Sequence, residues 1–443
     1  MTTATATATG GVLARFEPHS DDHVPAWLTD ARLAALEWVD EHGFPTRKDE
    51  DWKYTGLEPI LAVPFEAATA GSGRWVSAEM IEEVAVDLGG ARLVFVNGHF
   101  ASEFSRLSGL PSGAEVTNLA KVLASAPEHL EPFFSHPPGA HHAFAAFNDA
   151  LTEDGAFVHL APGTSVAAPI HLVFLSDTSG SALISSPRSV ILAGSGSRAT
   201  IVETYAGFDG DVYCTNAVTE AVIADGAQIE HYKMQNEAVT AFHLALLDVR
   251  QGPDSRFTSR SVMLGSSIAR HEVRVLLDEA GAEVSLDGVY LPQGDQLHDN
   301  TIFIDHVAVD CTSHQLYKGV LADRGHGVFN GHIMVRPGAD GTDANQNNKN
   351  LILSDRAEVD TRPRLEIYTD DVKCTHGAAV GQLDDEALLY LRARGIPLAM
   401  ARGLLIAAFV HQMVDRIELE PLRAHLETLI ATRFAAGDRS VQP

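Results

Sequence analysis

The sequence predicts a mainly β protein in which helical sequence precedes and follows a long β-rich core. Between residues 155 and 367, short runs rich in Val, Ile, Leu and Thr alternate with Gly, Asp and Pro turns, and convincing helical periodicity is absent. A weak repeat of about 30 residues runs through this core. Such a period suits strands stacked as the coils of a β-helix or solenoid. A β-sandwich also contains many short strands, so the repeat alone leaves both folds open.

Composition divides the chain into four parts. The Thr/Ala-rich start lacks a basic segment followed by an apolar one, so we expect a disordered tail and no secretory signal. Apolar residues at helical spacing between residues 31 and 39 predict a helix, and Phe95-Val96-Asn97-Gly98-His99 predicts a strand that ends in a turn. The predicted parts are the tail 1–24, a mostly helical N-terminal domain 25–150, the β core 151–370 and a helical C-terminal domain 371–443.

The repeat is clearest where a turn residue opens an alternating strand. Its best copies are Gly226-Ala227-Gln228-Ile229, Gly281-Ala282-Glu283-Val284 and Arg356-Ala357-Glu358-Val359. Looser copies begin at Gly196, Asp254 and Gly325. Most starts lie about 30 residues apart, but the step from Gly281 to Gly325 is about 44 residues, which predicts an insertion in one coil.

Helical periodicity returns after His376. Asp384, Asp385 and Glu386 crowd a helix N-terminus, and Arg392 and Arg394 lie in the last turn before Gly395. Two further helices are expected over residues 398–417 and 421–434. In a solenoid, such helices can also cap the exposed final coil.

Composition excludes several classes of function. The chain has 32 Lys and Arg against 59 Asp and Glu, a net charge of −27, which opposes binding to nucleic acid and to anionic membrane surfaces. Three cysteines without a CxxC motif make a disulfide framework improbable and indicate a reducing compartment. No run of 18 apolar residues is present. We therefore expect a cytoplasmic protein that does not span a membrane.

Cys374 and His376 form the most informative pair for chemistry. Side chains two residues apart in an extended segment point to the same face, so the pair can offer one sulfur and one nitrogen donor to a single metal. A metal or an iron–sulfur cluster needs about four ligands. The pair is therefore half of a site or no site. His376 is the stronger candidate, because Cys374 must ionise beside Asp370 and Asp371.

A long series of residues resembles a known family. The pattern comprises Arg47, Glu50, Trp52-Lys53-Tyr54-Thr55, Phe147-Asn148, Asp154-Gly155, His306, Cys311-Thr312-Ser313-His314, Tyr317-Lys318-Gly319-Val320-Leu321, Val328-Phe329-Asn330-Gly331, Thr342-Asp343-Ala344, Gln346, Asn350-Leu351-Ile352-Leu353-Ser354-Asp355, Leu365-Glu366-Ile367, residues 370–377 and residues 389–396. It resembles the SufB/SufD family of iron–sulfur cluster assembly proteins, on its SufD branch.

Two positions support the branch. Asn348 stands where the SufB relative carries a cysteine that receives sulfur, and Cys374-Thr375-His376 stands where SufB carries a Glu-His-Glu run. This chain should therefore not accept persulfide sulfur by the SufB route. It departs from the usual SufD pattern in Ala339-Asp340-Gly341, where glutamine and lysine are more typical, and in Ala379, where threonine is frequent.

The resemblance implies a right-handed parallel β-helix between helical terminal regions. It also implies a complex with SufB and two copies of the ATPase SufC, which the C-terminal helices contact. A nascent cluster, or iron acquired for it, would be shared with SufB at their interface, with Cys374 and His376 as part of the ligand set. The chain lacks a Gly-x-x-x-x-Gly-Lys-Ser/Thr loop, so ATP would be bound by the partner and this subunit would be non-catalytic. Cluster type, the route of iron entry and binding of reduced flavin stay open.

Three other functions are compatible with a β-rich core but fit the sequence less well or stay open. A secreted β-helical carbohydrate-active enzyme is disfavoured by the missing export signal and by 7% aromatic residues. A SufB-like homodimeric scaffold is disfavoured by Asn348, while a purely structural subunit stays open. Core or surface roles are favoured for the remaining candidate histidines, and Cys311 is expected to be buried and inert. These histidines are His141, His142, His298, His306, His314, His326 and His332.

Overall fold

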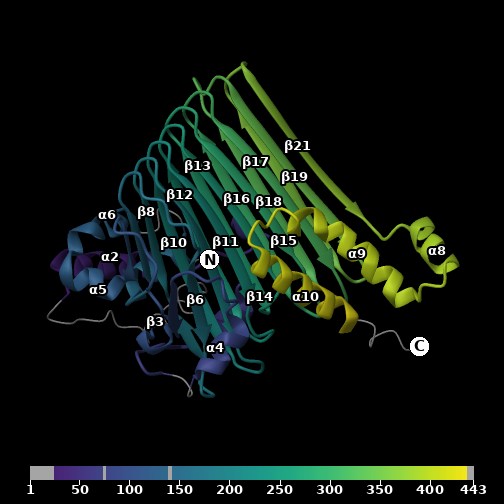
Figure 1. Ribbon diagram of the computed structural model, residues 1–443, viewed down its shortest axis with the longest axis horizontal. Helices are drawn as coiled ribbons and strands as arrows, with labels where there is room; N and C mark the ends of the chain where they lie inside the picture. Colours follow the sequence, from purple (N-terminus) through teal and green to yellow (C-terminus); the bar gives the residue numbers. More distant parts are fainter. Residues whose placement is uncertain (1–23, 73–75, 138–141, 437–443) are drawn as a thin grey trace, which may run out of the picture.

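The computed structural model describes residues 24–72, 76–137 and 142–436, and its centre is a parallel β-helix (Figure 1). From β8 onward, successive strands alternate between two sheets, so each sheet holds every second strand. Helical segments lie at the N-terminal end and along one flank near the C-terminus. The prediction of a mainly β protein with a parallel β-helix core and helical terminal regions is confirmed. The predicted tail of residues 1–24 lies outside the described residues, apart from residue 24.

At the N-terminal end of the solenoid, each sheet ends in one antiparallel pair of short strands, and the other strand pairs are parallel. The first sheet consists of β4 (Ala114–Asn118), β5 (Ala156–Leu160), β8 (Arg188–Ala193), β10 (Tyr213–Ile223), β12 (Phe242–Gln251), β14 (Ile268–Leu277), β16 (Leu297–His306), β18 (His326–Val335) and β20 (Glu358–Ile367), with β1 (Glu66–Ala67) and β7 (Leu183–Ser185) beside β10. The second sheet consists of β3 (His99–Phe100), β2 (Arg92–Val96), β6 (Ile170–Ser176), β9 (Arg198–Gly207), β11 (Gln228–Asn236), β13 (Arg256–Met263), β15 (Glu283–Tyr290), β17 (Thr312–Leu321), β19 (Thr342–Ile352) and β21 (Val372–Gly381).

Strands in a sheet pair so that inward side chains stack along the solenoid axis. In the second sheet, one such ladder runs through Ala199, Ile229, Phe257 and Val284. These side chains belong to the main apolar core between the sheets. Because a strand alternates its side chains between its two faces, every second residue enters this core. The same ladders continue to β21, which fixes the face on which its residues lie.

The coil repeat is regular, and the predicted insertion is wrong. The second-sheet strands from β9 onward begin 27 to 30 residues apart. The turn that follows the one at Gly281 is at Asp310, which adopts a φ of 57°. Gly325 instead precedes β18, in the first sheet. The error arose because strands of both sheets follow similar Gly and Asp turns, so the sequence repeat mixed two series.

Helices of the N-terminal region pack against both sheets: Leu28 and Val39 lie against the first, and Ile81 lies against Val94 and Val173 of the second. Helix α2 (Ala26–His42) contains the predicted segment 31–39, and β2 ends in the predicted turn at Asn97 and Gly98, both with positive φ. The other helical elements are η1 (Glu50–Trp52), α3 (Glu58–Leu61), α4 (Ala78–Val84), η2 (Ser102–Phe104), α5 (Leu119–Ser125), η3 (Pro127–His129), α6 (Glu131–Phe134) and α7 (Ala143–Leu151).

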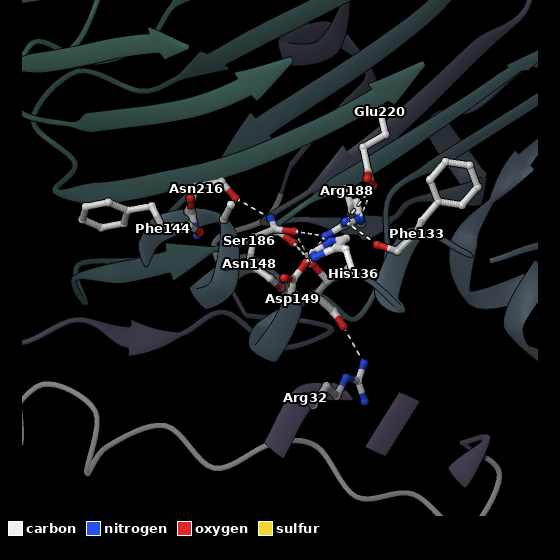
Figure 2. Close-up of polar contacts among 12 residues, drawn as sticks. Arg32, Phe133, His136, Phe144, Asn148, Asp149, Ser186, Arg188, Asn216 and Glu220 are labelled. Atoms are coloured by element: carbon white, nitrogen blue, oxygen red, sulfur yellow. Dashed lines mark hydrogen bonds and ion pairs between the residues drawn. The ribbon is translucent and has the colours of Figure 1, made fainter. Parts of the chain in front are cut away.

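A buried arginine joins this region to the solenoid (Figure 2). Arg188, at the start of β8, pairs with Asp149 of α7 at 2.6 Å and with Glu220 of β10 at 2.6 Å. Its guanidinium also donates to Phe133 O at 2.8 Å and lies 4.5 Å from the Phe134 ring centroid. Burial alone would lower the pKa of Arg188, but the two carboxylates outweigh it and raise that pKa. The guanidinium is therefore charged and holds α7 against β8 and β10 through its ion pairs with Asp149 and Glu220, which we call the Arg188 lock.

Three helices follow the solenoid: α8 (Asp385–Ala393), α9 (Leu398–Val414) and α10 (Glu420–Ala436). Helices α9 and α10 lie on the outer face of the second sheet, and α8 contacts α9. Ile406, Val410 and Met413 of α9 pack with Val289 of β15 and Val320 of β17. The helices thus cover a flank of the solenoid rather than capping its final coil. Within the part of the chain that the structure describes, no helix is long and apolar enough to cross a membrane.

Candidate functional site

Strand β21 places Cys374 and His376 on the inner face of the final coil. Cys374 is in register with Ala344 and packs against the main core, while His376 is in register with Gln346. Thr375, between them, faces outward, where Asn345 Nδ2 donates to its hydroxyl at 2.6 Å. The His376 side chain is exposed, because no further coil covers this end within the described ranges of the chain. The two donors therefore share one face, as their spacing predicts.

The thiol of Cys374 is protonated at neutral pH. Partial burial is the main cause of its raised pKa, and the Asp343 carboxylate adds to the effect. A hydrogen bond from the Ala344 backbone acts in the opposite direction. The expectation that Asp370 and Asp371 oppose ionisation of this thiol is wrong, because the carboxylate that raises its pKa is that of Asp343 on the neighbouring strand β19. Cys374 must still lose a proton before it can bind a metal.

The donor set is incomplete. Among the described residues, no group of three or more His, Cys, Asp or Glu side chains is arranged to hold a metal ion. Cys374 and His376 supply two donors at most, whereas an iron–sulfur cluster is held by about four. Any metal bound here needs ligands from outside this chain or from solvent.

Both strands of the final coil present an open edge. In the described structure, β20 pairs only with β18, and β21 pairs only with β19. All residues of β20 are half-buried or exposed, and Ile367, Tyr368 and Val380 at this end are 39%, 59% and 50% exposed. Long unpaired edges with apolar side chains are templates for pairing with another strand. The donors thus lie beside a surface suited to a partner (Figure 1).

Asn348 occupies the interior of the coil before the last. Its Nδ2 donates to the Tyr290 hydroxyl at 3.0 Å and to Tyr317 O at 3.3 Å, and its Oδ1 accepts from Asn350 Nδ2 at 2.6 Å. The residue is fully buried. Where the resemblance implies a sulfur-accepting cysteine in SufB, this chain therefore has an amide whose hydrogen bonds are made within the solenoid.

The other candidate histidines that the structure describes have hydrogen-bonding or ion-pair partners or lie on the surface. His298 Nε2 lies 2.9 Å from Gly265 O, and Asp299 beside it is paired with Arg270 at 2.5 Å, so this dipeptide is no metal site. His306 bonds Ser313 Oγ at 2.8 Å, and His142 accepts two backbone N–H bonds at the start of α7. His326 and His332 pair with Asp360 and Glu366, His314 faces outward, and His141 lies outside the described residues. Cys311 is fully buried, as expected, and all three cysteines are free.

A segment near the N-terminus reaches the final coil, which sequence reasoning missed. Trp52 lies 3.9 Å from the Arg270 guanidinium, and Asp51 O accepts from Arg270 at 2.9 Å. Glu50 then pairs with Arg362 of β20, and Asp51 pairs with Arg364 at 3.3 Å. We call residues 50–55 the strap, because they cross the outer face of the first sheet as far as β20. All strap residues except Asp51 belong to the family pattern, but pairs so distant along the chain cannot be read from it.

Helices α8 and α9 expose a second apolar surface, which we call the α8–α9 patch. Its five side chains are 45% to 69% exposed, with Leu389 the most exposed. They are Leu389, Tyr390, Leu398, Met400 and Leu404. Exposed large apolar side chains on neighbouring helices are candidates for contact with another protein. Helix α9 is also tied to the solenoid, because Lys318 Nζ donates to Phe409 O at 2.6 Å and Arg416, two residues after the helix, pairs with Asp287 at 2.9 Å.

Sequence comparisons agree with this architecture. Residues 174–409 match the family described as SUF system FeS cluster assembly, SufBD core domain, and residues 15–172 match the SufBD protein N-terminal region. The chain is 30% identical to the iron–sulfur cluster assembly protein SufD of Escherichia coli, over 90% of this chain and 91% of that protein. It is 30% identical to a SufBD family protein of Synechocystis, covering 92% and 91%, and 26% identical to SufD of Bacillus subtilis, covering 92% and 94%. The resemblance to the SufD branch is thereby confirmed, and the chain belongs to the SufBD family of iron–sulfur cluster assembly proteins of the SUF system.

Proposed function

We propose that this chain is the SufD-type subunit of a scaffold that it forms with a SufB-type subunit and a SufC-type ATPase. Nascent clusters, or the iron for them, are held where the final coils of the two β-helical subunits meet. The observation that carries this proposal is the position of Cys374 and His376, an incomplete donor pair beside two unpaired strand edges. A partner that pairs with those edges brings its own donors to the same place.

The two donors have different roles in this proposal. His376 binds iron through a neutral imidazole and is the resident ligand. Cys374 joins only after deprotonation, which a nearby metal ion favours by stabilising the thiolate. Iron and the cluster are cargo, so they leave for an acceptor. A half-site with few donors on each subunit suits such release, because separating the subunits removes ligands.

The ATPase docks on the α8–α9 patch. The chain has no phosphate-binding loop of its own, so ATP is bound by that partner, and this subunit is non-catalytic. Movement of the ATPase is transmitted to the solenoid through α9, which Lys318 and Arg416 hold against the second sheet. The buried Arg188 lock makes the N-terminal region move with the solenoid. We assign the complex to the cytoplasm.

The open edges of β20 and β21 also favour a second assembly. An edge strand can pair with the same strand of another copy about a two-fold axis. A homodimer of this chain is therefore the alternative when the SufB-type subunit is missing. It would bring two copies of the Cys374–His376 pair together, without the sulfur-accepting cysteine that Asn348 replaces.

Co-expression tests the proposal. The chain is produced with the SufB-type and SufC-type proteins of its own organism, purified without oxygen, and analysed for complex mass, iron and cluster absorbance. We expect a three-component complex that loses most of its iron in the Cys374→Ala/His376→Ala variant while its mass is unchanged. His314→Ala, which removes an outward-facing histidine of β17, is the matched control and keeps its iron. Full iron in the double variant would overturn the donor role, and the failure of any complex to form would overturn the assembly.

A further inference from the structure

Gln346 lies directly beneath His376. The two residues are register partners on β19 and β21, and both belong to the inward series of their strands. Neighbouring strands lie about 4.8 Å apart, so the Gln346 side chain is within reach of the imidazole when that ring turns toward the solenoid interior. Gln346 is fully buried, whereas His376 is exposed. Gln346 therefore lies on the same inward face as His376, one coil further into the solenoid.

The amide of Gln346 is held in one orientation. Its Nε2 donates to Gln315 Oε1 at 3.1 Å, one coil further in. The side chain extends across the interior to Gly331 of β18, where a Cβ would collide with Nε2. Its Oε1 is left without a hydrogen-bond partner among the described residues. A buried oxygen without a partner costs about 1–3 kcal/mol, so this acceptor is stabilised by any donor that reaches it.

The next inward position of β19 cannot serve the same purpose. Asn348 also points inward, but its register partner on β21 is Ala378, which has no polar side chain. Its amide is already bonded to Tyr290, Tyr317 and Asn350. Gln346 is thus the inward amide of β19 that combines an unused acceptor with a donor residue in register.

We propose that Gln346 is a positioning residue for His376. When the imidazole binds iron, Gln346 Oε1 accepts the hydrogen bond of one ring N–H, which leaves the other ring nitrogen free for the metal. Histidines that bind metals commonly donate their second ring N–H in this way, and the bond fixes both tautomer and ring orientation. The inference rests on the proposed role of His376 and adds the residue that orients it.

Cobalt(II) alone is the probe for the test. It is titrated without oxygen into the full-length chain, and binding is followed by its visible absorption, in which the thiolate-to-cobalt band reports Cys374. Gln346→Met keeps the volume of the side chain but removes the acceptor. We expect it to weaken cobalt binding about 10- to 100-fold and to alter the ligand-field bands while the thiolate band persists. In a His376→Ala background the same change should have no further effect.

Gln251→Met is the matched control, because Gln251 is also fully buried, also donates through Nε2 and also has an unpartnered Oε1, in β12. It should leave cobalt binding unchanged. Equal weakening by both glutamine variants would show general loosening of the core and would overturn the inference. If His376→Ala weakens binding but Gln346→Met does not, only the positioning role falls. If His376→Ala itself has no effect, the donor role in the proposed function falls as well.

Discussion

Tyr290 lies across Gly319, and its hydroxyl donates to Asn350 Oδ1 at 2.5 Å. The tyrosine belongs to β15 and the asparagine to β19, so the ring spans the intervening strand β17 at the one point where that strand has no side chain. Tyr317 of β17 in turn covers Gly288 of β15. Two rings thus interlock the coils beneath the donor pair, and each depends on a glycine opposite it.

The first prediction concerns this interlock. A Cβ at position 319 would lie 2.6 Å from Tyr290 Cε2, so Gly319→Ala forces the ring or the strand to move. We expect the free energy of unfolding in urea to fall by about 1–3 kcal/mol. Gly403→Ala is the control, since a Cβ there, in α9, meets no atom within 4 Å and should stabilise the helix by about 0.5–1 kcal/mol. Equal stabilisation by both changes would show that the ring yields freely.

The second prediction concerns the Arg188 lock. Arg188→Met leaves Asp149 and Glu220 buried without their cation, and breaking such a pair from one side is expected to lower the free energy of unfolding by about 3–5 kcal/mol. Arg324→Met removes a pair with Asp295 whose side chains are 51% and 71% exposed. That change should leave the free energy of unfolding close to that of the original protein, because solvent screens an exposed pair. Denaturant unfolding measures both, and similar values for the two variants would remove the special role of Arg188.

Local patterns in the sequence predicted the terminal helices and the kind of core. The acidic residues before α8 and the apolar spacing within α2 are short-range signals, and the structure has helices at both places. The coil that follows Gly281 was missed because its turn, at Asp310, lacks the Gly-Ala pair of the clearest copies, so the repeat placed the next start at Gly325, before a first-sheet strand. Aspartate adopts positive φ more readily than most residues, as Asp254 and Asp310 do here, so Asp and Gly turns replace one another between coils.

The candidate site was predicted in part. The spacing of Cys374 and His376 gave their common face, because side-chain alternation is a local property. The residue beneath His376 depends on the register between β19 and β21, and the strap depends on ion pairs such as Glu50 with Arg362. Such contacts are set by the stacking of coils, which a single sequence does not encode as a readable pattern.

The third prediction is an acid-sensitive stability. Burial lowers the pKa of His298 to about 3 and that of His306 to about 4, whereas in the unfolded chain each titrates near its ordinary value of 6.5. Between about pH 6.5 and pH 4, the unfolded state binds protons that the native state excludes. The stabilising contribution of the two histidines is therefore fully present above about pH 6.5. Within that range, acidification by one pH unit lowers the free energy of unfolding by about 1.4 kcal/mol for each histidine.

Urea unfolding at several pH values measures this slope. His298→Gln should remove the contribution of one histidine, and His298→Gln/His306→Gln should remove that of both. The loss of stability per pH unit should fall stepwise across the series. A slope that stays constant in all three proteins would show that other groups control acid unfolding.

The fourth prediction places the ATPase. Leu389 is 69% exposed on α8, so Leu389→Asp should leave the free energy of unfolding within about 0.5 kcal/mol of the original. If the α8–α9 patch is the docking surface, the change buries a charge in an apolar contact and should weaken binding of the SufC-type ATPase about 5- to 30-fold, measured by isothermal titration calorimetry. Val239→Asp, at a 57% exposed position between β11 and β12, is the control and should bind normally. Undiminished binding by the Leu389 variant would show that the ATPase contacts another part of the chain. Movement of the ATPase would then not reach the solenoid through the contacts of Lys318 and Arg416.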